Sequence, residues 1–170
     1  TAIALGIGAS MTTITVNYLM SADPIPNKSH QLFHIQVDSW DPNNAFNDDE
    51  DALPNQLTWT DATNFTHAKK ALRQSAMGMS GAIIEPAGDD AKPFEASIRL
   101  AYTDFFAMFE VPFIYGTPWE SASDNNREQV IVLSKRINES VFGGENSVGK
   151  TIIVDGRSFQ VVGVIDDWQP

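Results

Sequence analysis

The feature that most constrains this chain is an Asp-Gly pair between two β-branched runs near its C-terminal end. Thr151–Val154 precedes Asp155-Gly156, and Ser158–Ile165 follows it. Asp-Gly between apolar runs is the strongest short-range signal for a β-hairpin, because both turn residues tolerate a positive φ. We therefore expect two antiparallel strands that are joined by a two-residue turn.

The residues just before this hairpin match a nucleotide-binding pattern. Gly144–Thr151 reads Gly-x-x-x-x-Gly-Lys-Thr, the signature of the phosphate-binding P-loop. In a P-loop a strand enters the loop and a helix follows, so that the loop amides and the helix N-terminus converge on the phosphates. Here the pattern predicts a helix over 134–142, a stop at Gly143-Gly144 and then a strand.

Because this order is the reverse of the P-loop order, we interpret the match as coincidental and Lys150 as a solvated turn lysine. The alternative, a P-loop nucleotide hydrolase, would need the opposite flanking elements. The sequence therefore predicts no catalytic residue, no cofactor-binding residue in Gly144–Thr151, no cofactor and no metal ligand.

Composition narrows the class of protein. The chain has 170 residues, of which 42% are hydrophobic, so one domain with a real core can form. A net charge of −11 argues against binding to nucleic acid and to anionic lipid headgroups. The chain has no cysteine, which excludes disulfides, thiolate metal sites and a cysteine nucleophile.

The first twenty residues form the most apolar part of the chain. Thr1–Met20 contains no charged residue and is long enough to span a bilayer, so we expect it to be part of a membrane helix; a buried helix of a soluble domain is the alternative. Asp23-Pro24-Ile25-Pro26 then predicts a stiff, extended exit from that helix.

Several further elements follow from local patterns. The alternation in Gln31–Val37 predicts a half-buried strand, and Gln129–Leu133 a short buried one. Met77–Glu85 and Lys92–Ala101 indicate a hairpin. Thr58 and Asp61 resemble a capping box at the start of a helix, and cations lie near its C-terminus, where the helix dipole favours them (Lys69, Lys70 and Arg73).

Three groups of residues invite a functional interpretation. The acidic loop Asp41–Asp51 could bind calcium, but it lacks the regular ligand spacing and central Gly of such loops, which favours a solvated acidic loop. The histidines are too scattered for a metal site (His30, His34 and His67). The aromatic segment Phe105–Trp119 could be a ligand platform, although core packing is the simpler use of so much apolar area. Around this segment the pattern predicts a short helix over Thr103–Phe109 and an extended loop over Phe113–Trp119. Ser121–Arg127, which follows, is predicted to be polar and flexible.

The order of motifs resembles the periplasmic core domain of MacB-type ABC transporter permeases, which belong to the FtsX-like superfamily. The residues that carry this resemblance are spread over most of the chain: Leu5–Ala9, Asp23–Pro26, Tyr102–Phe109, Pro112–Gly116, Val132–Ser134, Phe142–Gly144, Val148–Lys150 and Phe159–Val164.

The resemblance implies a mixed α/β (α+β) fold, with a porter-like β-α-β sheet and an inserted smaller sub-lobe, preceded by part of a membrane helix. Residues 1–21 would be the periplasmic half of the first transmembrane helix, and residues 22–170 a periplasmic core domain, truncated at its C-terminus. Within it we expect the porter-like part at about 31–101 and 158–168, and the sub-lobe at about 102–156.

The resemblance also implies a function. Such a domain has no enzymatic activity and lies in the periplasm, anchored to the bacterial inner membrane. It couples ATP hydrolysis on a separate ATPase subunit or domain to efflux of macrolide-type or antimicrobial-peptide-type substrates. The expected partners are that ATPase, a second permease in a dimer, a periplasmic adaptor and an outer-membrane channel. Two alternatives stay open: a lipoprotein-releasing permease domain, and a stand-alone periplasmic binding module that uses Phe105–Trp119.

Overall fold

The computed structural model describes residues 11, 14–15, 25–41, 43–44, 46–47, 52–86 and 91–168. Most of Thr1–Met20, where we predict part of a membrane helix, lies outside these residues. Among the residues that are described, no helix has both the length and the apolarity needed to cross a bilayer.

The chain divides into two compact units, which are described separately. In the first, which contains residues 1–32, the described part includes a single-turn helix η1 (Ser29–Gln31) and the buried side chain of Ile25. The second unit, Phe33–Trp168, contains a six-stranded sheet. The predicted α+β class is therefore confirmed.

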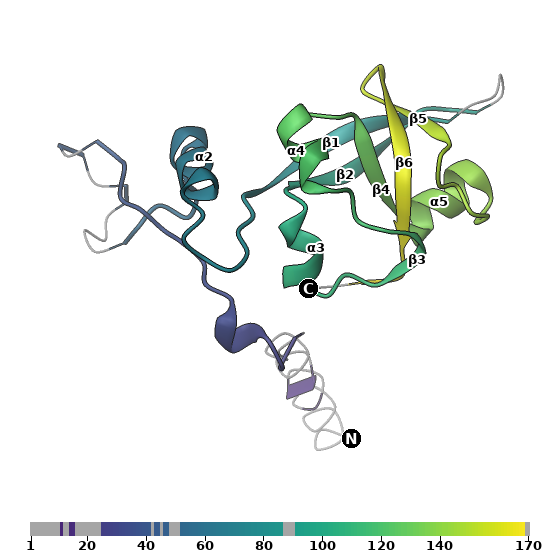
Figure 1. Cartoon of the computed structure of the whole chain (residues 1–170). Coiled ribbons are helices and arrows are strands. Elements are labelled where there is room, and N and C mark those ends of the chain that lie inside the picture. The colour runs from purple at the N-terminus through teal and green to yellow at the C-terminus, as the bar shows by residue number, and fades with distance from the viewer. Residues whose placement is uncertain are drawn as a thin grey trace, which may run out of the picture. The chain divides into compact units, whose positions relative to one another are not determined.

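The strand β6 (Arg157–Ile165) lies at the centre of this sheet (Figure 1). Along one edge it pairs antiparallel with β5 (Thr151–Val154) over its first half and with β3 (Phe113–Gly116) over its second half. Along the other edge it pairs in parallel with β4 (Val130–Ser134). Every residue of β6 except Val162 thus pairs with a neighbouring strand on at least one side.

The remaining strands extend the sheet beyond β5. β1 (Met77–Glu85) pairs with the end of β5, and β2 (Phe94–Ala101) pairs with β1 over its whole length, as the predicted hairpin requires. The turn Asp155-Gly156 has φ values of 48° and 71°, the double positive φ expected for it. The Asp155 carboxylate also accepts a 2.8 Å hydrogen bond from the Ile83 N–H, so this turn joins the two hairpins.

Apolar side chains cover both faces of the sheet. In β4, Ile131 and Leu133 belong to one hydrophobic cluster and Val132 to another, and successive side chains of a strand point to opposite faces. The first cluster includes side chains of α5 (Lys135–Phe142), and the second includes those of α3 (Asp104–Met108). The two helices therefore pack on opposite faces of the sheet.

The helix start and stop signals that we identified are present. Thr58 caps α2 (Trp59–Ala68), since its hydroxyl accepts a hydrogen bond of 3.1 Å from the Asp61 N–H. Ser134 caps α5 in the same way, and Gly143 ends that helix in the left-handed conformation. The predicted short helix within Thr103–Phe109 corresponds to α3.

Three local predictions are wrong. Gln31–Val37 is not a strand: residues 32–37 have no ladder partner, and without pairing an alternating pattern alone makes no sheet. Phe113–Trp119 is not only a loop, because its first half pairs with β6 as β3. Ser121–Arg127 is not irregular; it contains the helix α4 (Ser121–Asn126), which lacks the apolar periodicity that would have revealed it.

The division into a porter-like part at about 31–101 and 158–168 and a sub-lobe at about 102–156 stays a prediction, and the sheet contains strands of both parts. The boundary at residue 102 would assign β1 and β2 to one part and β3, β4 and β5 to the other. However, β5 hydrogen-bonds to both β1 and β6, so strands of both predicted parts belong to one continuous sheet.

Gly163 is the one glycine of β6, and its surroundings leave no room for a side chain. A Cβ atom there would lie 2.6 Å from a ring carbon of Phe113. We expect Gly163→Ala to lower the free energy of unfolding by about 1–3 kcal/mol, because the ring and β3 must move. Urea unfolding followed by circular dichroism measures this. Gly78→Ala is the control, since a Cβ at Gly78 meets nothing within 4 Å. Equal effects of the two substitutions would contradict this packing.

Candidate functional site

The glycine-containing loop Gly143–Lys150 is built onto the end of α5. Gly143 has a φ of 72°, and its N–H donates to the Glu139 carbonyl in the usual left-handed helix cap. The buried Asn138 then reaches into the loop, where its Nδ2 donates a 2.9 Å hydrogen bond to the Glu145 carbonyl. The loop is therefore fixed to the helix that precedes it.

Several amides of the loop donate hydrogen bonds within the protein. The Gly149 N–H donates to the Val161 carbonyl at 2.8 Å, and the Lys150 N–H donates to the Ser147 carbonyl at 2.9 Å. The Val148 N–H donates to the Asn146 side chain at 3.1 Å. In a P-loop such amides point at the phosphates instead.

The lysine of the motif also points elsewhere. The Lys150 ammonium lies 5.2 Å from the centre of the Phe142 ring, as in a cation–π contact. The flanking elements are a helix before the loop and the strand β5 after it, as we predicted. This geometry supports a structural role for the loop; the absence of nucleotide binding stays a prediction.

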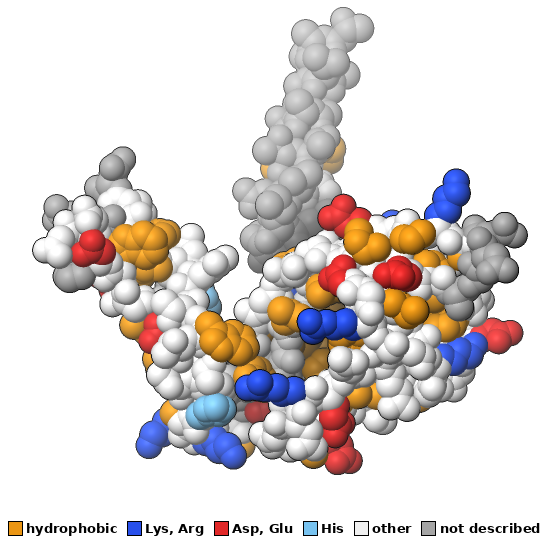
Figure 2. All heavy atoms as spheres, turned by 90° about the horizontal axis from the view of Figure 1, so that it is seen from above, with side chains coloured by type: hydrophobic (Ala, Val, Ile, Leu, Met, Phe, Trp, Pro, Cys, Tyr) orange, Lys and Arg blue, Asp and Glu red, His pale blue; other side chains and the backbone are white. Residues whose placement is uncertain are grey.

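The acidic and histidine residues do not gather into a site in the described part of the chain. Asp41 accepts hydrogen bonds from Asn43 and Asn44, and the bond from the Asn43 backbone N–H is the main reason why the pKa of Asp41 lies below its usual value. Asp48, Asp49, Glu50 and Asp51 lie outside the described residues. Among those described, no group of three or more His, Asp or Glu side chains could hold a metal ion, and Figure 2 shows acidic side chains scattered over the face that it draws.

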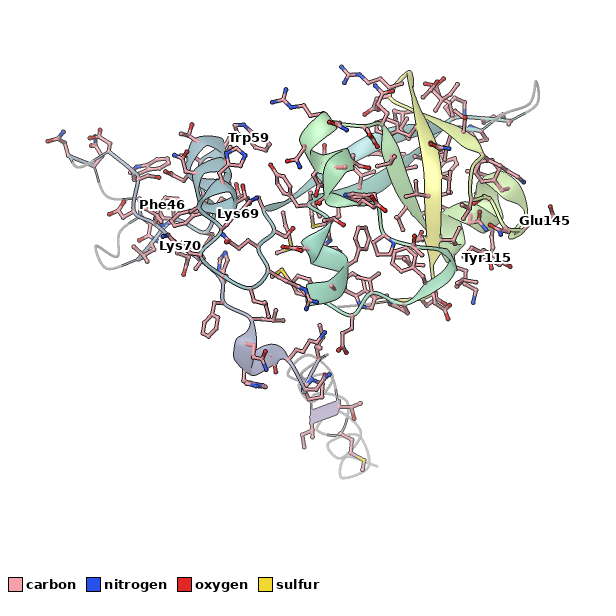
Figure 3. All side chains as sticks on the ribbon, in the orientation of Figure 1. Phe46, Trp59, Lys69, Lys70, Tyr115 and Glu145 are labelled. Atoms are coloured by element: carbon pink, nitrogen blue, oxygen red, sulfur yellow. The ribbon has the colours of Figure 1, made fainter. Side chains whose placement is uncertain are left out.

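A shallow hollow of about 280 Å³ lies where α5 meets β3 and β6. Its lining consists of Ile114, Tyr115, Lys135, Asn138, Glu139, Gly144, Val164 and Asp166. Figure 3 labels Tyr115 and Glu145, which lie at this end of the sheet. The sequence did not single out this hollow, because its residues come from three separate segments.

The charged groups of this hollow form a surface ion pair. Lys135 Nζ lies 3.3 Å from Asp166 Oδ1, and both side chains are about half exposed. The hydrogen bond to Asp166 raises the pKa of Lys135, while the Asp167 backbone N–H and then Lys135 lower the pKa of Asp166. Both shifts favour the charged forms, so neither group is prepared to transfer a proton near neutral pH.

A second hollow of about 450 Å³ lies beside the acidic loop. It is lined by Ser39, Trp40, Phe46, Pro54, Asn55, Gln56, Leu57 and Thr58, and the rings of Trp40 and Phe46 meet edge to face at 5.5 Å. No charged side chain is among these residues, so the hollow has no evident means of acid–base or metal chemistry.

The aromatic segment Phe105–Trp119 is mainly core. Phe105 and Phe106 are buried, and the Trp119 ring meets Phe106 edge to face at 4.6 Å. The indole N–H of Trp119 donates a 2.8 Å hydrogen bond to Asp124. Tyr115 instead lines the hollow beside α5, so the segment does not form one ligand platform.

The core role of this segment gives a direct test. We expect Phe106→Ala to lower the free energy of unfolding by about 3–5 kcal/mol, because it leaves a cavity between Trp119 and Phe113. Phe33→Ala is the matched control, since Phe33 is 78% exposed and should change stability little. Chemical denaturation of both variants measures the difference. If Phe106→Ala were as stable as the wild type, the ring would be available as a ligand surface.

The family model that matches this chain is MacB-like, and the two curated relatives are named as export ATP-binding/permease proteins. A family model described as "MacB-like periplasmic core domain" matches residues 1–170. The chain is 44% identical over 41 residues to the "Macrolide export ATP-binding/permease protein MacB" of Aggregatibacter actinomycetemcomitans, a match that covers 24% of this chain and 6% of that protein. It is 32% identical over 66 residues to the "Pyoverdine export ATP-binding/permease protein PvdT" of Pseudomonas syringae pv. syringae (strain B728a), which covers 38% of this chain and 10% of that protein.

Solved structures agree with this fold. The periplasmic region of MacB from Actinobacillus actinomycetemcomitans superposes with a TM-score of 0.55 and 25% identity, over 66% of this chain and 51% of that one. The extracellular domain of the noncanonic ABC-type transporter YknZ from Gram-positive bacteria has a TM-score of 0.55 at 14% identity, over 65% of this chain and 58% of that one. The chain thus spans about half of these solved regions and a small part of the curated relatives. Because the family model matches its whole length, the chain belongs to the family of MacB-like periplasmic core domains.

Proposed function

We propose that this chain is a non-catalytic, extracytoplasmic part of an ABC-type export permease. The match to the family model over residues 1–170 is the observation that carries this proposal. The loop Gly143–Lys150 supports it, because several of its amides donate hydrogen bonds within the protein instead of pointing at a phosphate. ATP hydrolysis would then belong to a separate ATPase subunit or domain. The domain would lie in the periplasm, and the permease that contains it in the inner membrane.

In this proposal the domain acts through protein–protein contacts and mechanical coupling. A sheet with a packed core on each face moves as one body, so a displacement at one edge is transmitted to the other. The partners would be the ATPase, a second permease, a periplasmic adaptor and an outer-membrane channel. The half-exposed ion pair Lys135–Asp166 on the hollow beside α5 fits a wet protein contact better than a catalytic centre.

The class of substrate is the finer part of the proposal. The two curated relatives are named as exporters of a macrolide and of pyoverdine, which differ in chemistry. We therefore assign efflux of a macrolide-type or antimicrobial-peptide-type molecule as the working hypothesis, with lipoprotein release as the alternative.

The proposal is tested in the complete transporter by replacing residues 33–168 with a Gly/Ser linker. We expect ATP hydrolysis of the purified transporter to persist and substrate export from cells to be lost, because the motor is separate from this domain. A transporter with an inactivated ATPase site is the control that loses both activities. Loss of ATP hydrolysis on removal of the domain, with the transporter still inserted, would contradict a non-catalytic role. Export that continued without the domain would contradict the coupling role.

A further inference from the structure

The segment between Phe33 and Ala76 exposes an unusual amount of apolar surface. Among its described residues only Pro54 is buried. Its exposed large apolar side chains are Phe33, Ile35, Trp40, Phe46, Leu53, Trp59, Phe65 and Leu72. Exposed apolar area of this kind on one stretch of chain is typical of a surface that binds another molecule.

Within this segment, α2 and the turn after it form the best-defined surface. α2 has no buried residue, although Trp59 and Phe65 belong to one side of the helix together with Ala62. Trp59 is 75% exposed and Phe65 40% exposed. A ten-residue helix has little stability by itself, so its apolar side is expected to pack against something.

The turn that follows α2 is held in place by Gln74. The Gln74 side chain donates to the Phe65 carbonyl at 2.5 Å and accepts a hydrogen bond from the Ala71 N–H at 3.1 Å. The Gln74 backbone N–H donates to the Asp104 carboxylate at 2.9 Å, and the Ser75 hydroxyl accepts from the Tyr102 N–H at 3.2 Å. The turn is thus tied to α2, to the residue that follows β2 and to the first residue of α3.

This ordered turn presents cations and one apolar side chain to solvent. Lys69, Lys70 and Arg73 are exposed, and Leu72 between them is 95% exposed. No ion pair in the described part of the chain involves any of these three cations. Three neighbouring cations are notable in a chain with a net charge of −11. Figure 3 labels Trp59 at one end of α2 and the two lysines at the other.

We propose that α2 and its turn form a docking surface for an acidic segment of a partner protein that also carries a large apolar side chain. The surface consists of Trp59, Phe65, Lys69, Lys70, Leu72 and Arg73, hereafter the α2 surface. The cations pair with the partner's carboxylates, and Leu72 with Trp59 or Phe65 takes up its apolar group. The inference deepens the proposed function, on which it rests for the kind of partner, by assigning the chemistry of one contact.

A protein segment fits this surface better than a membrane. An anionic bilayer would attract the three cations but repel the rest of a chain with a net charge of −11. A narrow acidic segment contacts the α2 surface alone and avoids this repulsion. The exposed Leu72 adds a specific apolar contact, which a purely electrostatic surface would not need.

The test measures binding of a short fluorescent peptide of alternating Glu and Leu to the 170-residue chain by fluorescence anisotropy. We expect saturable binding of the Glu and Leu peptide that weakens with salt and depends on Lys69, Lys70 and Arg73. Attraction of the matching Lys and Leu peptide to a chain with a net charge of −11 should not depend on these three cations. The triple charge reversal of Lys69, Lys70 and Arg73 to Glu should weaken binding by roughly ten-fold or more. Leu72→Ser, which keeps every charge, should weaken it by about three-fold or more.

The control reverses the same number of charges elsewhere. Lys92, Arg136 and Arg157 are also exposed, and changing them to Glu should leave affinity nearly unchanged. Circular dichroism checks the fold of each variant, and the milder change of Lys69, Lys70 and Arg73 to Gln replaces any variant that unfolds. An equal loss in the control variant would overturn the α2 surface as the site.

Two further assays distinguish a partner protein from a membrane and from a second copy of the chain. If the chain bound phosphatidylglycerol vesicles more tightly than the peptide, and this binding depended on Lys69, Lys70 and Arg73, the α2 surface would be a membrane surface and the inference would be overturned. Self-association that disappears in the triple variant, seen by sedimentation, would overturn it in favour of a second copy of the chain. Neither assay uses ATP hydrolysis or transport, so a failure here leaves the proposed transporter function untouched, and a failure of that function would not change the binding result.

Discussion

The pairing of β6 on both of its edges is the constraint on which the rest of this unit depends. One edge is shared by β5 and β3, and the other is taken by β4. The register between β4 and β6 shifts at Val162, where β6 carries one extra residue. A bulge of this kind turns the following side chains over, so that Val161 joins the first hydrophobic cluster and Ile165 the second.

This arrangement explains the composition of the loop before β5. The chain must leave α5, turn and enter a strand that lies directly beside β6. Gly143, Gly144 and Gly149 all have positive φ values, from 72° to 86°, which other residues adopt only with strain. The glycines that imitate a P-loop are therefore required by the path of the backbone. The Gly149 N–H and the Val161 carbonyl then join the loop to the central strand.

The parts of the fold that could be predicted are those with local signals. Asp155-Gly156, the Thr58 cap and the Gly143 stop each specify a turn or a helix end through their own backbone preferences, and all three are observed. The strand β3 was missed because its pairing with β6 depends on contacts far along the chain. Residues 32–37 were wrongly predicted as a strand for the opposite reason, since alternation was present without a partner strand.

The surfaces were harder to predict than the fold. The three cations after α2 were visible in the sequence, but they were interpreted only as helix-end charges. Their presentation depends on Gln74, whose hydrogen bonds reach the Phe65 carbonyl and the Asp104 carboxylate. No spacing rule identifies a glutamine in this role. The hollow beside α5 was missed in the same way, because its lining comes together only when β3 and β6 pair.

We infer that the P-loop-like segment Gly144–Thr151 is a structural connector in a domain without its own nucleotide chemistry. Calorimetric titration of the chain with Mg-ATP tests this most directly. We expect no heat beyond dilution, for the wild type and for Lys150→Ala alike, because several loop amides donate within the protein and Lys150 lies over Phe142. Micromolar binding to the wild type that is abolished by Lys150→Ala would contradict it.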